Sequence, residues 1–456
     1  MRENLSSVLR ALLQAPGAVS MTMLTYTQIL RSDWKMDRTP DNKERKMKAA
    51  HFCTTDFGGA FRAASRINSA MRLCNADSSL FVRTKTRSDT DCTGIIDTPV
   101  KSFVSKSKNL ANLMLSKGEV ITDRFGTDIT KTQAAKNADV IILHWVNSFV
   151  SAGTIKKLAE SGKPVIWVMH DMWPYTGGCH HGYGCERYEE GCGKCPFLKS
   201  TDENDRSRKN FLQKQEALKG SGFAIVSPSI WNKECSEKSG IMAGLQKHVI
   251  RNPIDTKIYN PQGDPYLIRK KLGLPMHKKL ILFGAMVQSV HKWEGMQMVA
   301  EAVALLPADI KKDCELLLFG NAPGMDLSVF DIPARSLGHI DGEKEIADIY
   351  RAADVFISPS VADNYPNTLL ESICCGTPCV CFDIGGMGDL VKTGVTGYLA
   401  APKDTGDLSK GLFAVFDSDL KEKLKSPEHN KNLSDNSYDI IGRQYVKLCE
   451  ELMDNG

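Results

Sequence analysis

Residues 357–378 read ISPSVADNYPNTLLESICCGTP, and this order of residue types is the clearest structural signal in the chain. An apolar run over Val355–Ser358 predicts a strand, Pro366 marks the start of a helix, and Gly376 ends that helix. A second apolar run, Cys379–Phe382, predicts the next strand. A strand, a crossover helix and a further strand are typical of a parallel sheet, so we expect the α/β class.

The same alternation of apolar runs and helical segments extends on both sides of this stretch. We expect further strands at Ala49–Thr54, Ser79–Val82, Val140–Trp145, Val165–Met169, Ala224–Ser227, Val249–Arg251, Leu280–Gly284 and Leu316–Phe319. The segment 251–265 holds three prolines and little periodicity, so we place a linker there. We therefore expect two Rossmann-like domains that face each other across a cleft, where ligands of open α/β sheets bind.

These boundaries divide the chain into four parts. The predicted parts are an N-terminal extension outside the fold at 1–46, a first domain at 47–255, a second domain at 256–430, and a C-terminal segment at 431–456. The last segment contains a predicted helix, Tyr438–Met453, that we expect to pack back on the first domain. Met47 is an alternative start of translation, and an amphipathic membrane anchor is the alternative interpretation of Leu5–Leu13.

The composition excludes several classes of protein. No apolar run reaches the roughly 18 residues that cross a bilayer. The net charge of +4 is small and the basic residues are spread along the chain, so we expect no nucleic-acid partner. The chain has no recognisable signal peptide, and Cys374 and Cys375 are adjacent, so we interpret the compartment as reducing and cytoplasmic.

Two carboxylates flank the start of the predicted helix at Pro366. Free amides in the first helical turn would bind a diphosphate. Glu371 would accept hydrogen bonds from a ribose, and Asp363 would accept hydrogen bonds from a transferred sugar. The alternative is that Asp363 caps the helix and Glu371 pairs with a surface lysine. The combination with Asn367 and Gly376 favours a binding site.

The segment from Asp363 to Glu371 resembles a motif of retaining glycosyltransferase family 4, in which an acidic residue is followed, after seven other residues, by a glutamate. The phrase DNYPNTLLES, residues 363–372, resembles more narrowly the bacterial transferases of the colanic-acid and exopolysaccharide group. The resemblance runs from about Met47 to the C-terminus, with Asp363 where most members carry glutamate. It implies the GT-B fold, with Asn367 and Thr368 among the donor-binding residues.

The resemblance also implies substrates and a location. The donor would be a nucleoside diphosphate sugar, bound by the second domain, and the acceptor a glycan or polyprenyl-linked glycan, bound by the first. Transfer would retain the anomeric configuration. The protein would act in the cytoplasm, in peripheral contact with the inner face of the cell membrane.

Two motifs of the first domain agree with the resemblance. Residues 56–62, DFGGAFR, are similar to the family's glycine turn, where Gly58 and Gly59 let the backbone approach the donor, although a tight turn explains them equally well. His170 resembles the family's histidine at a strand end, which implies a catalytic role in positioning or electrostatics. The alternative is a structural histidine, and for His144 we expect a core role.

The leaving diphosphate must be neutralised, and we expect fixed cations and amides rather than a catalytic metal, because no Asp-x-Asp pair stands in a metal-binding context. The family's arginine and lysine match Ala285 and Glu294 here. Lys292 is the candidate replacement, and the alternatives are weak activity, a solvated lysine or a non-catalytic relative.

Four cysteines lie in one glycine-rich loop, residues 179–195. Tetrahedral thiolate ligation by Cys179, Cys185, Cys192 and Cys195 predicts structural zinc, with His180 and His181 as substitute ligands. The alternatives are free thiols or disulfides. A site closed by four ligands has no position for catalysis, so we expect the loop to shape the region beside His170.

The leading hypothesis is therefore a glycosyltransferase of cell-surface polysaccharide biosynthesis. A nucleotide-sugar epimerase or phosphorylase of the same architecture is one alternative, since the fold does not fix the chemistry. A non-catalytic relative acting as a binding protein is another. A nicotinamide dehydrogenase is disfavoured because the first strand and turn lack the three-glycine fingerprint.

Overall fold

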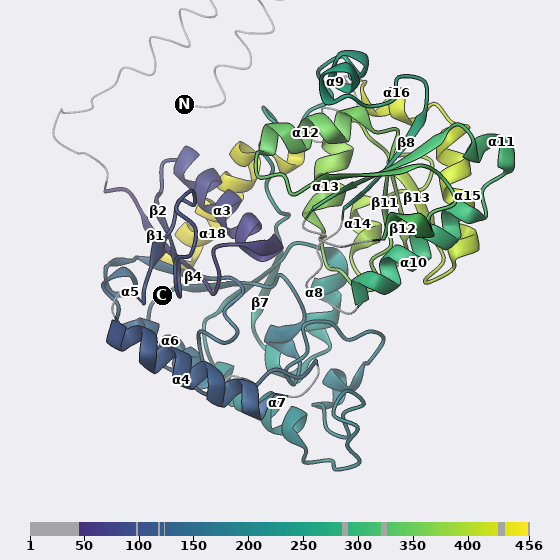
Figure 1. Ribbon diagram of the computed structural model, residues 1–456. Coiled ribbons are helices and arrows are strands. Elements are labelled where there is room, and N and C mark those ends of the chain that lie inside the picture. Colours follow the sequence, from purple (N-terminus) through teal and green to yellow (C-terminus); the bar gives the residue numbers. More distant parts are fainter. Residues whose placement is uncertain are drawn as a thin grey trace, which may run out of the picture. The chain divides into compact units, whose positions relative to one another are not determined.

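The computed structural model describes residues 45–96, 99–116, 119–122, 124–284, 291–320, 326–426 and 434–454 (Figure 1). The chain separates into two units, Met1–Lys46 and Met47–Gly456, and all described strands belong to the second unit. The segment Leu5–Leu13 lies outside the described residues. No described helix is long and apolar enough to cross a bilayer.

The first sheet has seven parallel strands in the order β3-β2-β1-β4-β5-β6-β7. Its strands are β1 Lys48–Cys53, β2 Asp77–Val82, β3 Thr93–Gly94, β4 Val140–Leu143, β5 Val165–Val168, β6 Ala224–Ser227 and β7 Gln246–Val249. Its helices are α3 Gly58–Leu73, α4 Pro99–Leu115, α5 Gln133–Asn137, α6 Ala152–Ala159, α7 Arg206–Leu218 and α8 Ile230–Glu237. Strands β4, β5 and β6 are buried throughout, as central strands covered on both faces must be.

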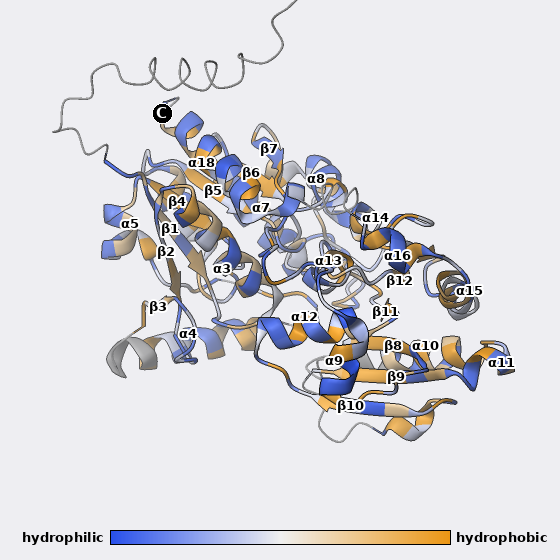
Figure 2. Ribbon diagram, turned by 90° about the horizontal axis from the view of Figure 1, so that it is seen from above, coloured by the Kyte–Doolittle hydropathy of each residue, from blue (hydrophilic) through white to orange (hydrophobic). Residues whose placement is uncertain are grey.

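The second sheet has six parallel strands in the order β10-β9-β8-β11-β12-β13. Its strands are β8 Lys279–Gly284, β9 Cys314–Phe319, β10 Ala334–Gly338, β11 Val355–Ser358, β12 Cys379–Phe382 and β13 Gly397–Ala400. Its helices are α9 Pro265–Leu272, α10 His291–Ala304, α11 Ala308–Lys311, α12 Glu343–Ala352, α13 Asn367–Cys374, α14 Met387–Leu390, α15 Thr405–Phe416 and α16 Leu420–Leu424. In Figure 2, α12 shows both colours, because the hydrophobic residues Ile346 and Ile349, which are buried, lie on one face while its other face is polar.

The prediction of an α/β protein with two Rossmann-like sheets is confirmed. The predicted strand Val249–Arg251 was placed too late: β7 begins at Gln246 and ends at Val249. This edge strand is polar and only partly buried, so it has no apolar run to mark it. Strands β3, β10 and β13 were not predicted, and β10 is likewise a mostly exposed edge strand.

Helix α18, Tyr438–Asp454, packs against α3, and the purple and yellow ribbons lie side by side in Figure 1. Its buried side chains join a cluster with residues of α3 and of the first sheet, which contains Ile67, Met71, Ile142, Ile166, Ile441, Tyr445 and Leu448. The two connections between the sheets run beside each other, since Ile254 N donates to Asn436 O at 2.8 Å. The last described helix therefore completes the core of the first sheet.

Candidate functional site

The loops that follow β5 and β11 meet at Asn364. Its side-chain amide donates to Met169 O at 3.0 Å and to His170 O at 3.2 Å, and its carbonyl oxygen accepts from Ser229 Oγ at 2.5 Å. Asn364 is only 2% exposed, so these contacts are shielded from water. The carboxyl ends of both sheets are thereby joined beside Asp363 and His170.

Asp363 is half-buried in the loop between β11 and α13. Its Oδ1 accepts from Asn364 N at 2.8 Å, and its backbone oxygen accepts from Gly386 N at 3.2 Å. A Cβ at Gly385, whose φ is +60°, would lie 2.1 Å from Asp363 O, so only glycine permits this close approach. Burial raises the pKa of Asp363, and the nearby His181 partly opposes this rise.

Glu371 lies in α13 and is fully buried, at 0% exposure. Its Oε1 accepts from Arg66 Nη2 at 2.8 Å and from Arg62 Nη1 at 3.3 Å, while its Oε2 accepts from Tyr350 Oη at 3.4 Å. Both arginines come from α3 of the first sheet. The alternative pairing predicted for Glu371, with a surface lysine, is replaced by a buried pairing with arginine.

Arg66 is itself buried and contacts a second acid, since its Nη2 donates to Glu343 Oε1 at 2.7 Å. Its guanidinium also lies 5.1 Å from the ring centroid of Tyr259. Burial lowers the pKa of Arg66, but Glu371, Tyr259 and Glu343 outweigh this and hold the pKa above its usual value. Among the described residues, Nε and Nη1 of Arg66 have no hydrogen-bond partner.

The predicted glycine turn lies against the start of α13. Asn367 Nδ2 donates to Gly59 O at 3.1 Å, and Gly58 adopts a φ of +87° that favours glycine. Leu370 N is bonded to Pro366 O, while the amides before it in the first turn have no acceptor within the helix. Gly58, Gly59, Asn367 and Thr368 thus lie close to this helix end.

The predicted cation position lies mostly outside the described residues. Ala285 and the side chain of Lys292 lie outside the described residues, and Glu294 is exposed on α10. Sequence reasoning missed Arg62 and Arg66 as cations near Glu371. The available signal was their spacing of four residues on α3, which places both on one face of a helix.

His170 lies beyond the end of β5, where its Nε2 is 2.9 Å from Nδ1 of His144. Burial lowers the pKa of His170 to about 4, although Asp171 acts in the opposite direction. His170 is therefore neutral at pH 7, which favours a hydrogen-bonding role over an electrostatic one. His144, for which a core role was expected, is buried and also bonded to His170.

Asp171 organises the polar side chains next to His170. Its Oδ2 lies 2.5 Å from His180 Nδ1 and accepts from Trp145 Nε1 at 2.8 Å. Burial alone would raise the pKa of Asp171, but His180 and other contacts bring it below its ordinary value. His180 thus binds a carboxylate through Nδ1.

Among the described residues the cysteine loop shows no group arranged around a metal, so zinc ligation stays a prediction. Cys179, Cys185, Cys192 and Cys195 are free thiols, and the described part of the chain contains no group of three or more His, Cys, Asp or Glu side chains arranged to hold a metal. Burial raises the pKa of Cys179, and it raises that of Cys192 to about 11. Other contacts hold the loop, including Cys195 N to Asp205 Oδ2 at 2.8 Å.

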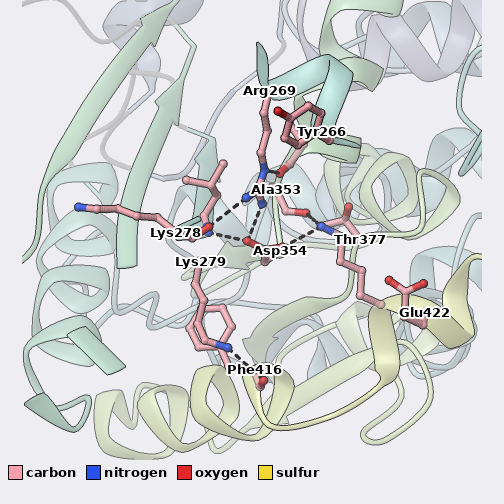
Figure 3. Close-up of polar contacts among 12 residues, drawn as sticks. Tyr266, Arg269, Lys278, Lys279, Ala353, Asp354, Thr377, Phe416 and Glu422 are labelled. Atoms are coloured by element: carbon pink, nitrogen blue, oxygen red, sulfur yellow. Dashed lines mark hydrogen bonds and ion pairs between the residues drawn. The ribbon is translucent and has the colours of Figure 1, made fainter. Parts of the chain in front are cut away.

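A second charged cluster surrounds Asp354 at the opposite end of β11 (Figure 3). Asp354 accepts from Arg269 Nη2 at 2.7 Å, from Leu280 N at 2.7 Å and from Lys421 Nζ at 2.9 Å. Ligands of open α/β sheets bind at the carboxyl ends of strands, whereas this cluster lies at an amino end. We therefore assign it a structural role in joining α9 and α16 to the sheet.

Comparison with solved structures defines the class of fold. Sucrose-phosphate synthase from Thermosynechococcus elongatus superimposes with a TM-score of 0.64 at 16% identity, covering 90% of this chain and 100% of that one. Anabaena Alr3699/HepE in complex with UDP-glucose gives a TM-score of 0.58 at 15% identity, covering 89% of this chain and 100% of that one. The protein has the two-domain GT-B fold of glycosyltransferases.

Sequence comparison finds similarity to known proteins over part of the chain. Residues 277–417, which include Asp363 and Glu371, match the family model described as "Glycosyl transferases group 1". The D-inositol 3-phosphate glycosyltransferase of Corynebacterium aurimucosum is 28% identical over 269 residues, or 56% of this chain and 61% of that relative. The protein of the same name from Xylanimonas cellulosilytica is 33% identical over 172 residues, or 34% of this chain and 40% of that relative. The matched regions thus span 61% and 40% of these two relatives.

Proposed function

We propose that the protein is a glycosyltransferase that moves a sugar from a nucleoside diphosphate sugar to a glycan or polyprenyl-linked acceptor. The observation that carries this proposal is the meeting of Asp363, His170 and the first turn of α13 at the carboxyl ends of both sheets. We further propose family 4 chemistry, with retention, in the synthesis of cell-surface polysaccharides. The domain at 47–255 would hold the acceptor and that at 256–430 the donor.

The donor would lie against the start of α13. Amides of the first turn, with Asn367 and Thr368, would bind the diphosphate, and the turn at Gly58 and Gly59 would close over it. Glu371 would bind the ribose. Oε1 of Glu371 accepts from Arg66 and Arg62 and Oε2 accepts from Tyr350, so Oε2 would keep one lone pair for a ribose hydroxyl.

We propose that Arg62 and Arg66 supply positive charge for the leaving diphosphate, alongside Lys292. Two observations support this role. Both arginines contact Glu371, and Nε and Nη1 of Arg66 have no hydrogen-bond partner among the described residues. In this chain Ala285 and Glu294 stand where a positive charge was expected. Cations from α3 would replace that charge from the opposite domain.

Asp363 and His170 would bind the transferred sugar. The acceptor hydroxyl attacks the anomeric carbon as the bond to the nucleoside diphosphate breaks, the diphosphate departs with the electron pair of that bond, and the hydroxyl proton passes to an oxygen of the departing diphosphate. A neutral His170 would position a sugar hydroxyl by a hydrogen bond. Asp363 would accept a hydrogen bond from the same sugar.

Thermal unfolding in the presence of a panel of nucleoside diphosphate sugars tests the donor site. We expect one donor to raise the unfolding temperature of the wild type, and Glu371→Gln to weaken its binding at least about 10-fold, or roughly 1.4 kcal/mol. Glu343→Gln is the matched control, because Glu343 also contacts Arg66 but lies on α12 with a side chain 36% exposed. A panel without any stabilising donor, or equal binding by Glu371→Gln, would refute the assignment.

Product analysis separates the competing activities. A transferase forms product only with an acceptor present. Sugar isomerised without acceptor would indicate the epimerase, transfer to phosphate the phosphorylase, and binding without turnover the non-catalytic relative.

We also propose that α4 makes the peripheral contact with the inner face of the cytoplasmic membrane. This helix exposes Phe103 at 73%, Leu113 at 69% and Met114 at 78%, and its sequence contains lysines but no acid. Exposed apolar side chains on a helix that contains lysines and no acid are complementary to an anionic lipid surface.

Sedimentation with vesicles of phosphatidylglycerol or phosphatidylcholine tests this contact. We expect binding to the anionic vesicles and its loss in Phe103→Ser/Met114→Ser. Leu305→Ser, at a residue 60% exposed outside α4, is the matched control and should bind like the wild type. Equal sedimentation of all three proteins would contradict the proposal.

A further inference from the structure

Three histidine rings stack across the first sheet and end at His170. His51 lies on β1, His144 follows β4 and His170 follows β5, which are neighbouring strands. The centroids of successive rings are 5.2 Å apart in both pairs, near the roughly 4.8 Å spacing of adjacent strands. Ser78 on β2 continues this row on the far side of His51.

Each ring is hydrogen-bonded to the next. His144 Nδ1 lies 2.9 Å from His170 Nε2, His51 Nδ1 lies 2.9 Å from His144 Nε2, and Ser78 Oγ lies 2.9 Å from His51 Nε2. Ser78 Oγ in turn donates to Asn68 Oδ1 at 2.7 Å. His51, His144, Ser78 and Asn68 are all at most 2% exposed, so water does not interrupt the chain.

The far end of this chain fixes the position of every proton. Ser78 has one hydroxyl proton and gives it to Asn68, so Ser78 Oγ must accept from the N–H at Nε2 of His51. The unprotonated Nδ1 of His51 then accepts from Nε2–H of His144. By the same rule, Nδ1 of His144 accepts from Nε2–H of His170, which leaves Nδ1 of His170 with a free lone pair.

All three rings are neutral at pH 7, as this pattern requires. Burial and Arg72 lower the pKa of His51 to about 3, and burial lowers that of His144 well below its ordinary value. Within the part of the chain that the structure describes, Nδ1 of His170 makes no hydrogen bond.

We propose that His144 and His51 are positioning residues that hold His170 in its Nε2–H tautomer, so that Nδ1 accepts a hydrogen bond from a sugar hydroxyl. This role rests on the proposed function of His170. A tautomer fixed through the sheet makes the site selective, because His170 then offers an acceptor and no donor at Nδ1. A sugar lacking the matching hydroxyl would lose this contact.

The tautomer of His170 is measurable without any substrate. Two-dimensional ¹⁵N NMR of the histidine-labelled protein, assigned with His170→Gln, distinguishes Nε2–H from Nδ1–H. We expect Nε2–H in the wild type, and a mixture of tautomers in His144→Phe, which keeps a ring but removes both nitrogens. His144→Gln should restore Nε2–H, since its amide oxygen accepts from His170 and its amide nitrogen donates to His51.

The second readout is the steady-state kinetics of sugar transfer, measured with the nucleoside diphosphate sugar that stabilises the protein in the thermal-unfolding panel. We expect His144→Phe to lower kcat about 10–100-fold, as loss of an orienting partner does, with KM changed less than about 2-fold. His144→Gln should recover most of this loss. His248→Phe is the matched control, because His248 lies on β7 and its Nε2 is buried with no partner among the described residues.

Each outcome decides the proposal. An Nδ1–H tautomer in the wild type would overturn it, whether or not the variants fold. His144→Phe with an unchanged tautomer, or with the activity of His248→Phe, would also overturn it. If no donor is found, the proposed function fails, while the NMR result still shows whether the histidine chain fixes His170.

Discussion

Replacing Arg66 with methionine should lower the free energy of unfolding by about 3 kcal/mol. Breaking a buried ion pair costs about 3–5 kcal/mol, because the remaining charge stays buried. The side chains of Arg66 and Glu371 are 3% and 0% exposed, so solvent does not screen them. We expect the lower end of the range because Arg62 still donates to Glu371 at 3.3 Å.

Two further variants isolate the charge of Glu371 as the cause. Arg62→Met should cost no more than about 1 kcal/mol, since the side chain of Arg62 is 40% exposed and such pairs contribute little. Adding Glu371→Gln to Arg66→Met should recover most of the lost stability, because a neutral amide needs no cation. Methionine preserves much of the length of arginine, so packing changes little.

Urea-induced unfolding, followed by circular dichroism, measures these differences by linear extrapolation. The reasoning is refuted if Arg66→Met is no less stable than Arg62→Met. It is also refuted if the double variant is less stable than Arg66→Met alone, because the loss would then arise from packing.

Four other substitutions test features of the site. Gly58→Ala should cost about 1–2 kcal/mol of stability from its positive φ, whereas Gly59→Ala should be neutral or stabilising, and urea unfolding compares the pair. Asn364→Ala should cost at least about 2 kcal/mol in the same assay, because three buried groups lose a partner. Burial raises the pKa of Asp363 in the folded protein above 3.8, its value in the unfolded chain. Ionisation of Asp363 therefore destabilises the fold as the pH rises from 3.8 through the folded pKa. Asp363→Asn should therefore be more stable than wild type at pH 7 and equal to it below pH 3.8, while losing sugar transfer; equal thermal unfolding curves at both pH values would contradict this.

The elements around the site were predictable because their signals are local. Strands β11 and β12 are buried throughout and were predicted to the residue, and Pro366 and Gly376 mark the ends of the helix between them. Strand β7 was misplaced because this edge strand is polar and only partly buried, so no apolar run marks it. Local periodicity therefore identifies buried elements better than exposed ones.

The contacts that assemble the site were not predictable from such signals. Arg66 and Glu371 are 305 residues apart in the chain, and nothing in the residues around Arg66 indicates a partner on another sheet. Asn364 was part of the quoted motif, but its bonds reach Met169 and His170 in the first half of the chain. Contacts between residues this far apart in the chain depend on how the two sheets pack, which local sequence patterns do not specify.

The zinc prediction for the cysteine loop rests on spacing. The number and spacing of Cys179, Cys185, Cys192 and Cys195 suit zinc, but spacing does not specify which way the side chains turn. Positive φ at Tyr183, Cys192 and Lys194 bends the loop, and among the described residues no group of three or more His, Cys, Asp or Glu side chains is arranged to hold a metal.

The position of α18 determines when the first sheet can finish folding during synthesis. All seven strands of that sheet emerge from the ribosome by Val249, but residues that cover one of its faces, including Ile441 and Tyr445, emerge only after the strands of the second sheet. Until then the nascent chain presents an apolar surface of the kind that chaperones bind. A fragment that stops before Tyr438 would retain every strand of the first sheet and still leave that face open to water.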